Sequence, residues 1–388
     1  MKRTNLLIAA AFLFIGFFTF RSLSQTQEHQ PPQTNQSSSS QKIQVAILLD
    51  VSNSMDGLID QAKAQLWNMV NTMGKATCNG AAPKIEIALY EYGRETNNAK
   101  EGFVKQLSGF STDLDKLSNI LFSLKTNGGD EYCGQVIYTS LNQLTWDNTP
   151  GNYKVIFIAG NEDFLQGNLN YKKACDLAKE KGVIVNTIYC GDRMQGLSEH
   201  WNVNDECGGG SFTNINQDAK IEEMVTPYDD VILSLNDTLN NTYLYYGTNG
   251  NGFANNQKQL DQKNYSVGKS VAVKRSMVKS KSTLYENANW DMVDKVTEDK
   301  DFVNKVDIKT LPDSLRNKSK AEIQKIVSVK KEERTKIQQK IEENSMLRDK
   351  FIATEKAKKS GGKNVSTLES EIEKIIRKQA KEFKMIIP

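Results

Sequence analysis

The chain has 388 residues, of which 38% are hydrophobic and 25% are charged, a balance that excludes a wholly disordered chain and a membrane-embedded one. Its only histidines are His29 and His200, so the sequence offers almost no histidine for a histidine-ligated zinc site or a Ser-His-Asp triad. We therefore expect no enzyme. The net charge of +3 conceals an asymmetry, because residues 1–268 carry about −7 and residues 269–388 about +10.

The N-terminus has the pattern of a secretory signal: Met1-Lys2-Arg3 precedes an apolar run from Leu6 to Phe20. We expect a signal peptide over 1–24 and an exported protein, periplasmic or secreted, with an uncleaved anchor as the alternative. Residues 25–41 are rich in Gln, Ser, Thr and Pro and predict a flexible polar spacer. No later segment approaches 18 apolar residues, so we expect no membrane span after signal removal.

Between residues 42 and 237, short apolar segments alternate with segments of helical spacing. The predicted strands are 43–49, 84–90, 153–159, 183–189 and 211–215. The predicted helices are 58–73, 114–124, 136–144, 171–181 and 218–236. This alternation predicts an α/β fold with a doubly wound, mostly parallel sheet and helices on both faces.

The rest of the chain predicts a linker and then a charged, mainly helical region. Residues 238–268 are rich in Asn, Gln, Tyr and Gly and are expected to form the linker, and residues 269–388 the basic helical region. Two helices separated by Gly361-Gly362 predict an antiparallel hairpin over 321–385. We expect the surplus positive charge of this region to face solvent, an acidic partner or the acidic α/β domain. We also expect the folding of residues 269–388 to depend only in part on the α/β domain.

Five cysteines in an exported chain form at most two internal disulfides. Cys190 ends a predicted strand and Cys207 follows in the next loop, so we expect these two to pair. Cys133 lies at the same edge of the sheet and is the competitor for Cys190.

The residues best suited to bind a ligand follow the first strand, in Asp50-Val51-Ser52-Asn53-Ser54. Ligands of open α/β sheets bind at the carboxyl ends of strands. One carboxylate and two hydroxyls here supply the hard oxygen donors that Mg²⁺ or Ca²⁺ takes. The alternative is structural, with Asp50 ending the strand and Ser52 or Ser54 capping the helix.

This strand and loop resemble those of a von Willebrand factor type A domain, over roughly residues 41–236. The family has a Thr in a second loop after a Gly-Gly pair, and here the carboxylate of Asp130 or of Glu131 falls at that position. The family's third loop carries an Asp where this chain has Gly160, followed by Asn161 as a neutral oxygen donor. The resemblance thus implies a metal-ion-dependent (MIDAS-like) site. Its ligands would come from Asp50, Ser52, Ser54, Asp130, Glu131 and Asn161, and its ion would be Mg²⁺, with Ca²⁺ or Mn²⁺ as alternatives.

The C-terminal region resembles, more loosely, the helical extension of exported bacterial type A proteins, on Thr226–Asp230 and Tyr243–Tyr246. Two functions follow. The first is a binding or adhesion module that recognises a protein or glycan ligand, through a ligand carboxylate that completes the coordination of the metal. The alternative is a metal-free structural scaffold of the cell envelope that acts through its charged helical tail. Neither involves nucleic acid or catalysis.

Overall fold

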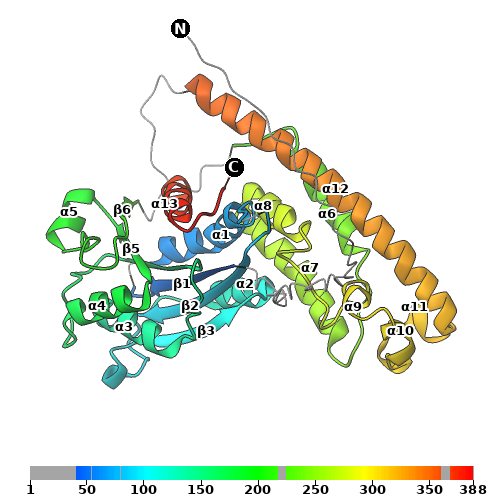
Figure 1. Cartoon of the computed structure of the whole chain (residues 1–388), viewed down its shortest axis with the longest axis horizontal. Coiled ribbons are helices and arrows are strands. Elements are labelled where there is room, and N and C mark those ends of the chain that lie inside the picture. Colours follow the sequence, from blue (N-terminus) through cyan, green and yellow to red (C-terminus); the bar gives the residue numbers. More distant parts are fainter. Residues whose placement is uncertain (1–40, 54, 79, 217–223, 360–367, 388) are drawn as a thin grey trace, which may run out of the picture. The chain divides into compact units, whose positions relative to one another are not determined.

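The computed structural model describes residues 41–53, 55–78, 80–216, 224–359 and 368–387 (Figure 1). The predicted signal peptide, almost all of the spacer, the Gly361-Gly362 break and Ser54 lie outside the described residues. Within those residues, no helix has the length and apolar character needed to cross a membrane.

A six-stranded sheet in the order β3-β2-β1-β4-β5-β6 forms the centre of the α/β part, and only β3 pairs antiparallel with its neighbour (Figure 1). The strands are β1 (Lys42–Asp50), β2 (Lys84–Tyr92), β3 (Lys105–Ser111), β4 (Tyr153–Gly160), β5 (Ile184–Cys190) and β6 (Phe212–Ile215). This is the order of a doubly wound sheet. The predicted fold class is therefore confirmed.

The edge strand β3 is the one strand that the sequence patterns missed. Its sequence KQLSGFS has few apolar residues and a central glycine, and most of its side chains stay at least partly exposed. Such a strand has no apolar alternation to detect, because it lies at the edge of the sheet and buries little.

The two faces of the sheet bury separate cores, as alternation along β1 requires. Val45, Ile47 and Leu49 contribute to one core, whereas Ala46 and Leu48 contribute to the other. Helices α1 (Asp56–Met73) and α2 (Leu114–Ser123) pack on the first core, called the α1 face below. Helices α3 (Cys133–Gln143) and α4 (Tyr171–Lys181) pack on the second, called the α3 face. The short helices η1 (Ala99–Glu101) and α5 (Arg193–Ser198) lie in connections.

The C-terminal region is helical, as predicted, but its internal organisation differs. Its helices are α6 (Asp229–Asn240), α7 (Gly250–Val267), α8 (Lys269–Lys279), α9 (Met292–Glu298), α10 (Phe302–Lys305), η2 (Ile308–Thr310), α11 (Asp313–Arg316), α12 (Lys320–Lys359) and α13 (Leu368–Glu382). The linker expected over 238–268 is wrong, because most of it is α7. Polar side chains there, such as the buried Gln257 and Asn264, conceal its helical character.

The hairpin expected over 321–385 is also corrected. Helix α12 packs on α6, α8 and α9, whereas α13 packs on α1 and β6 (Figure 1). The apolar stripe of α13, with Ile372, Ile375 and Ile376, belongs to the core of the α1 face. Each helix thus has its own neighbours, and the stripe that suggested a hairpin is used to cover the sheet.

Helix α8 joins the same core through Val271 and Val278, both fully buried. The C-terminal region is therefore part of the α/β fold. The expectation that it folds with only partial dependence on the α/β domain is corrected, because α8 and α13 cover apolar surface that the sheet and α1 leave open.

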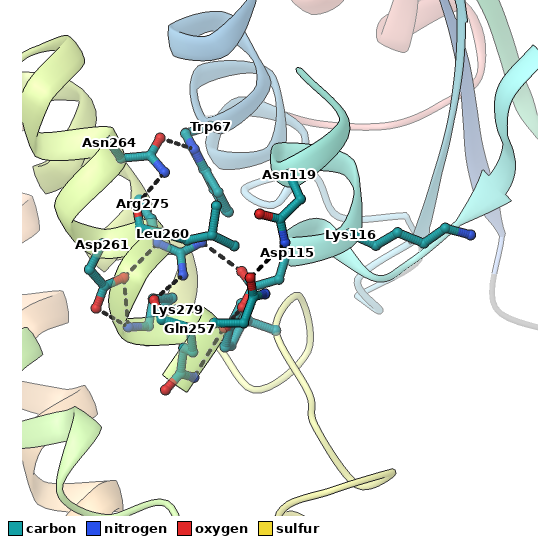
Figure 2. Close-up of polar contacts among 12 residues, drawn as sticks. Trp67, Asp115, Lys116, Asn119, Gln257, Leu260, Asp261, Asn264, Arg275 and Lys279 are labelled. Atoms are coloured by element: carbon teal, nitrogen blue, oxygen red, sulfur yellow. Dashed lines mark hydrogen bonds and ion pairs between the residues drawn. The ribbon is translucent and has the colours of Figure 1, made fainter. Parts of the chain in front are cut away.

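Several of its basic side chains are buried and paired inside the protein, contrary to the expectation that they face solvent. Arg275 is 1% exposed and Lys279 is fully buried. Arg275 donates to Asp115 at 2.7 Å and to Asp261 at 2.6 Å, and Lys279 also contacts Asp261 at 2.8 Å (Figure 2). The guanidinium of Arg275 also lies over the ring of Trp67, 4.7 Å from its centroid. These contacts join α7 and α8 to α1 and α2.

The disulfide links Cys175 to Cys207, so the predicted Cys190–Cys207 pair is wrong. The reason is the alternation of side chains along β5. Cys190 points into the core of the α1 face, whereas Cys175 and Cys207 lie in the core of the α3 face. Cys133 shares that second core but remains a free buried thiol.

Candidate metal centre

Three loops meet at the carboxyl ends of β1, β2 and β4. Asp50 is opposite Tyr92 in the register of β1 with β2, and Leu49 is opposite Ala159 in the register with β4. The loop after β1 is held to the loop after α2 by a hydrogen bond from the Asn127 amide to the Val51 carbonyl, 2.8 Å. The parallel strands thus place the three sequence-predicted loops at one edge of the sheet.

Asp50 and Ser52 form the base of the site. Asp50 is fully buried, and its Oδ1 accepts a hydrogen bond from the Ser52 amide at 2.8 Å. Its Oδ2 and the Ser52 hydroxyl are both buried, and neither makes a hydrogen bond of good geometry with a described residue. Two buried oxygens without partners are costly in a folded protein unless a ligand, an ion or water satisfies them.

Glu131 lies beside Asp50, against the backbone of Gly93. A Cβ at Gly93 would lie 2.8 Å from Glu131 Cγ and 2.9 Å from Asp50 Oδ1. Gly93 also has a φ of 79°, in the left-handed region that favours glycine. A side chain at this position would therefore displace one or both of these carboxyl side chains, and glycine lets both lie against the same backbone position.

Gly160 leaves room for a different contact. A Cβ there would lie 2.5 Å from the hydroxyl of Tyr92 and 3.1 Å from Asp50 Oδ2. The Tyr92 hydroxyl donates to the Ala159 carbonyl at 2.9 Å. Tyr92 thus fills the space that an aspartate side chain at position 160 would need, which explains physically why the acid expected in the third loop is absent.

Asp50 and Glu131 lie close together and are shielded from solvent, and both have raised pKa values. Burial raises the pKa of Asp50 to about 6, and the charge of Glu162 adds to this. Burial raises the pKa of Glu131 to about 8, with further contributions from Asp50 and Glu162. The amide of Ser52 and that of Asn161 oppose the shift of Asp50 by hydrogen bonding to its carboxylate. Both carboxyls are thus poised to gain from a bound cation.

The other residues predicted as metal ligands lie in different environments. Asp130 is exposed and accepts a hydrogen bond from the Tyr132 hydroxyl at 3.0 Å, whereas Glu131 is 8% exposed and faces Asp50. Asn161 reaches Asp50 through its backbone amide. Ser54 lies outside the described residues. Of the two acids that the sequence left open, Glu131 is the one placed at the site.

Three residues of the site were not singled out from the sequence as site residues. Tyr92 and Gly93 lie just beyond the predicted strand 84–90, and only the register of Tyr92 opposite Asp50 shows that they reach the site. Glu162 is exposed, yet its charge raises the pKa of both buried carboxyls. An acid two residues after a strand end was the available signal for Glu162.

The residues present fit a divalent cation of the hard type. Asp50 Oδ2, the Ser52 hydroxyl and the Glu131 carboxylate are oxygen donors, and Mg²⁺ binds through one or two carboxylates while it keeps several waters. Among the described residues, no three His, Cys, Asp or Glu side chains cluster as a ready-made metal site. The donor set here combines two carboxyls with a hydroxyl.

Comparisons with known proteins give structural likenesses only. No protein-family model and no curated protein matches the sequence. Matching solved structures include the SpRpn10 VWA domain, with 15% identity and TM-score 0.34, over 45% of this chain and 88% of that one. The proximal thread matrix protein 1 of the mussel byssus, in a form with a zinc-occupied MIDAS motif, matches with 11% identity and TM-score 0.34. The pilus adhesin SpaC from Lactobacillus rhamnosus GG matches with 14% identity and TM-score 0.32.

The chain spans less than half of the mussel protein, with 45% of this chain matched to 42% of that one, and the SpaC match covers 46% and 28%. The strand order and the position of the Asp50 loop are properties of the chain itself. By these, the α/β part of the protein is a von Willebrand factor type A-like domain.

Proposed function

We propose that this protein is an exported binding module that holds a divalent cation, Mg²⁺ in the first place, at Asp50, Ser52 and Glu131. The cation recognises a protein or glycan partner through a carboxylate of that partner, which completes the coordination sphere. The observation that carries the proposal is the pair of buried oxygens without partners, Asp50 Oδ2 and Ser52 Oγ, beside the carboxyl of Glu131.

A bound cation resolves the energetic problem of the site. Two desolvated carboxyls with raised pKa values favour protonation in the folded state, and a divalent ion replaces those protons. A single metal–carboxylate contact does not hold a macromolecule by itself, so the partner must also contact the surrounding loops. We propose no catalysis.

The alternative of a scaffold acting through a charged tail has less support. Its most distinctive basic groups are already used inside the fold, as Arg275 and Lys279 show. Arg334 pairs with Asp291 at 2.7 Å, and Arg348 pairs with Asp229 at 2.8 Å. These four cations are not available to an external acidic surface.

Titration calorimetry of the full chain with Mg²⁺, Mn²⁺ and Ca²⁺ tests the metal. We expect heat of binding that is lost in Asp50→Asn and reduced in Glu131→Gln, whereas Asp130→Asn, the exposed neighbour, keeps it. Capture of partners from envelope extracts with and without chelator then tests recognition. No binding heat for any of the three ions, together with a thermal midpoint that millimolar Mg²⁺ does not raise, contradicts the proposal.

A further inference from the structure

A second site lies away from the metal centre, in a cavity of about 1100 Å³ between α2, the first turns of α7 and the loop 286–290. We call it the α2–α7 cleft. It borders the first turns of α2, from Thr112 to Ile120, whereas the metal centre uses the loop that follows the last turn of that helix. Ligand pockets of proteins typically measure roughly 300–1,000 Å³, so this cleft is large enough for a ligand of several rings.

Polar uncharged residues are the largest group in the lining of the cleft, eight of its eighteen residues. Six of its eighteen residues are asparagines, namely Asn119, Asn249, Asn251, Asn256, Asn287 and Asn289. Thr112 and Thr248 add two hydroxyls. An amide group carries both donors and an acceptor. Such a surface is complementary to hydroxyl groups, which donate and accept at the same oxygen.

Carboxyl groups also line the cleft, but the chain already engages them. Asp115 accepts from Arg275 at 2.7 Å (Figure 2). It also accepts from the Tyr285 hydroxyl at 2.7 Å. Asp113 accepts from the Lys116 amide at 2.9 Å and caps α2. These two acids are therefore neutralised or held by partners from the protein, and neither calls for a cationic ligand.

The other two acids of the lining, Glu286 and Glu298, are hydrogen-bonded to each other. Glu298 pairs with Lys295 at 2.7 Å. Burial and a hydrogen bond with Glu298 raise the pKa of Glu286. The one lysine of the lining, Lys116, points away from the Asp115–Arg275 contacts (Figure 2).

The side-chain amide of Asn287 has a buried donor without a hydrogen-bond acceptor among the described residues. It is 8% exposed, and its Oδ1 accepts from Trp290 Nε1 at 3.1 Å. Its Nδ2 is buried and has no hydrogen-bond partner among the described residues. A buried donor that makes no hydrogen bond costs about 1–3 kcal/mol in stability, so a ligand that offers an acceptor to this Nδ2 would remove that cost.

Aromatic side chains complete the surface. Phe253 is 44% exposed at the start of α7, and Trp290 forms part of the wall, stacked on Tyr243. Aromatic faces pack against apolar surfaces while polar groups at their margins make hydrogen bonds. A sugar ring has both features, since its C–H face is apolar and its hydroxyls point outward.

We propose that the α2–α7 cleft binds a neutral oligosaccharide, with Asn249 and Asn287 bonding to hydroxyls and Phe253 packing on a sugar ring. The site does not rest on the metal centre, because it shares no residue with it. Binding is therefore independent of divalent cations.

The test is calorimetry of the full chain, in chelator, with three uncharged hexasaccharides: cellohexaose, maltohexaose and the hexamer of N-acetylglucosamine. We expect at least one to bind. Phe253→Ala and Asn249→Ala, both at exposed positions, should each weaken it about tenfold. Asn287→Asp keeps the acceptor for Trp290 but removes the donor, and should weaken binding as well.

Tyr265→Ala is the matched control, because Tyr265 is also an exposed aromatic residue on α7, at 56% exposure, but does not line the cleft. It should bind like the wild type. The proposal is overturned if no hexasaccharide binds at millimolar concentration, or if Phe253→Ala and Asn249→Ala bind as tightly as Tyr265→Ala. Stronger binding of hexalysine than of any sugar also overturns it, in favour of a cationic peptide. Sugar binding that requires Mg²⁺ and is lost in Asp50→Asn overturns it in favour of the metal centre.

Discussion

Arg275 and Asp115 lie 160 positions apart in the chain, yet Nη1 of the arginine donates to Oδ1 of the aspartate at 2.7 Å inside the protein. The arginine comes from α8, in the C-terminal region, and the aspartate from α2, beside the sheet. Since Asp261 of α7 shares the same guanidinium, one buried ion cluster fixes three helices to one another.

Replacing Arg275 with Met is expected to cost about 3–5 kcal/mol in the free energy of unfolding, because two buried carboxylates lose one of their charged or hydrogen-bonding partners. Urea denaturation measures the loss. Lys358→Met is the control, since Lys358 and Glu355 form an exposed pair whose removal should cost less than about 1 kcal/mol. Asp115→Leu combined with Arg275→Met should recover part of the loss. Equal costs for Arg275→Met and Lys358→Met would contradict a stabilising role of the buried cluster.

Shortening Ile376 to Ala tests whether α13 is part of the core. Ile376 is fully buried against the α1 face, so the cavity left behind should cost about 2–5 kcal/mol. Met346→Ala on α12 is the matched control, because Met346 is 59% exposed and its truncation should leave the urea midpoint almost unchanged. If α13 were an independent tail, both variants would unfold at the wild-type midpoint.

The Cys175–Cys207 disulfide is expected in the oxidised protein, and it joins residues 32 positions apart. Thiol titration after unfolding should find the three free cysteines, Cys78, Cys133 and Cys190. Replacing both Cys175 and Cys207 with Ala should lower the free energy of unfolding by about 3–4 kcal/mol, from loop-closure entropy. A peptide that joins Cys190 to Cys207 under non-reducing digestion would restore the pairing expected from the sequence.

Stability should fall between pH 5 and pH 8 when no divalent cation is present. The folded-state pKa of Glu131 is about 8 against an ordinary value of 4.5, so its contribution to stability is complete below pH 4.5 and is lost as the pH rises through 8. In this window the folded state binds more protons than the unfolded state, and the free energy of unfolding declines by on the order of 4 kcal/mol.

Glu131→Gln should remove most of this decline, whereas Asp130→Asn, its exposed neighbour, should keep it. Saturating Mg²⁺ should flatten the wild-type profile as well, because the ion favours the ionised carboxyls. Thermal unfolding at pH 5 and pH 8 measures these differences. A decline of the same size in Glu131→Gln would place its origin elsewhere in the protein.

The strands of the sheet could be predicted from the sequence wherever they are buried on both faces. The run IQVAILL of β1 is apolar in both alternating sets, and α4 spans Tyr171–Lys181, the range that its periodicity predicts. The Asp50 loop was found for the same reason, since a strand end followed by a helix fixes its place. Short-range patterns therefore sufficed for these parts.

The remaining features depend on contacts between distant residues. The side on which Cys190 lies is set by the phase of β5, and a shift of one residue reverses it. Lys279 and Arg334 look like surface charges in the sequence, because nothing near them in the chain reveals Asp261 or Asp291. The same holds for Tyr92, whose position beside Gly160 follows only from the register of two strands with β1.

The closure of the α1 face by α13 has a consequence for how the protein is made. The strand that starts this core is complete at residue 50, but Ile372 and Ile376 are translated more than 300 positions later. Thr77 even exchanges two backbone hydrogen bonds, both of 2.9 Å, with Ile386. A nascent chain on the ribosome therefore carries a partly uncovered apolar face until those residues emerge, a condition that slows folding.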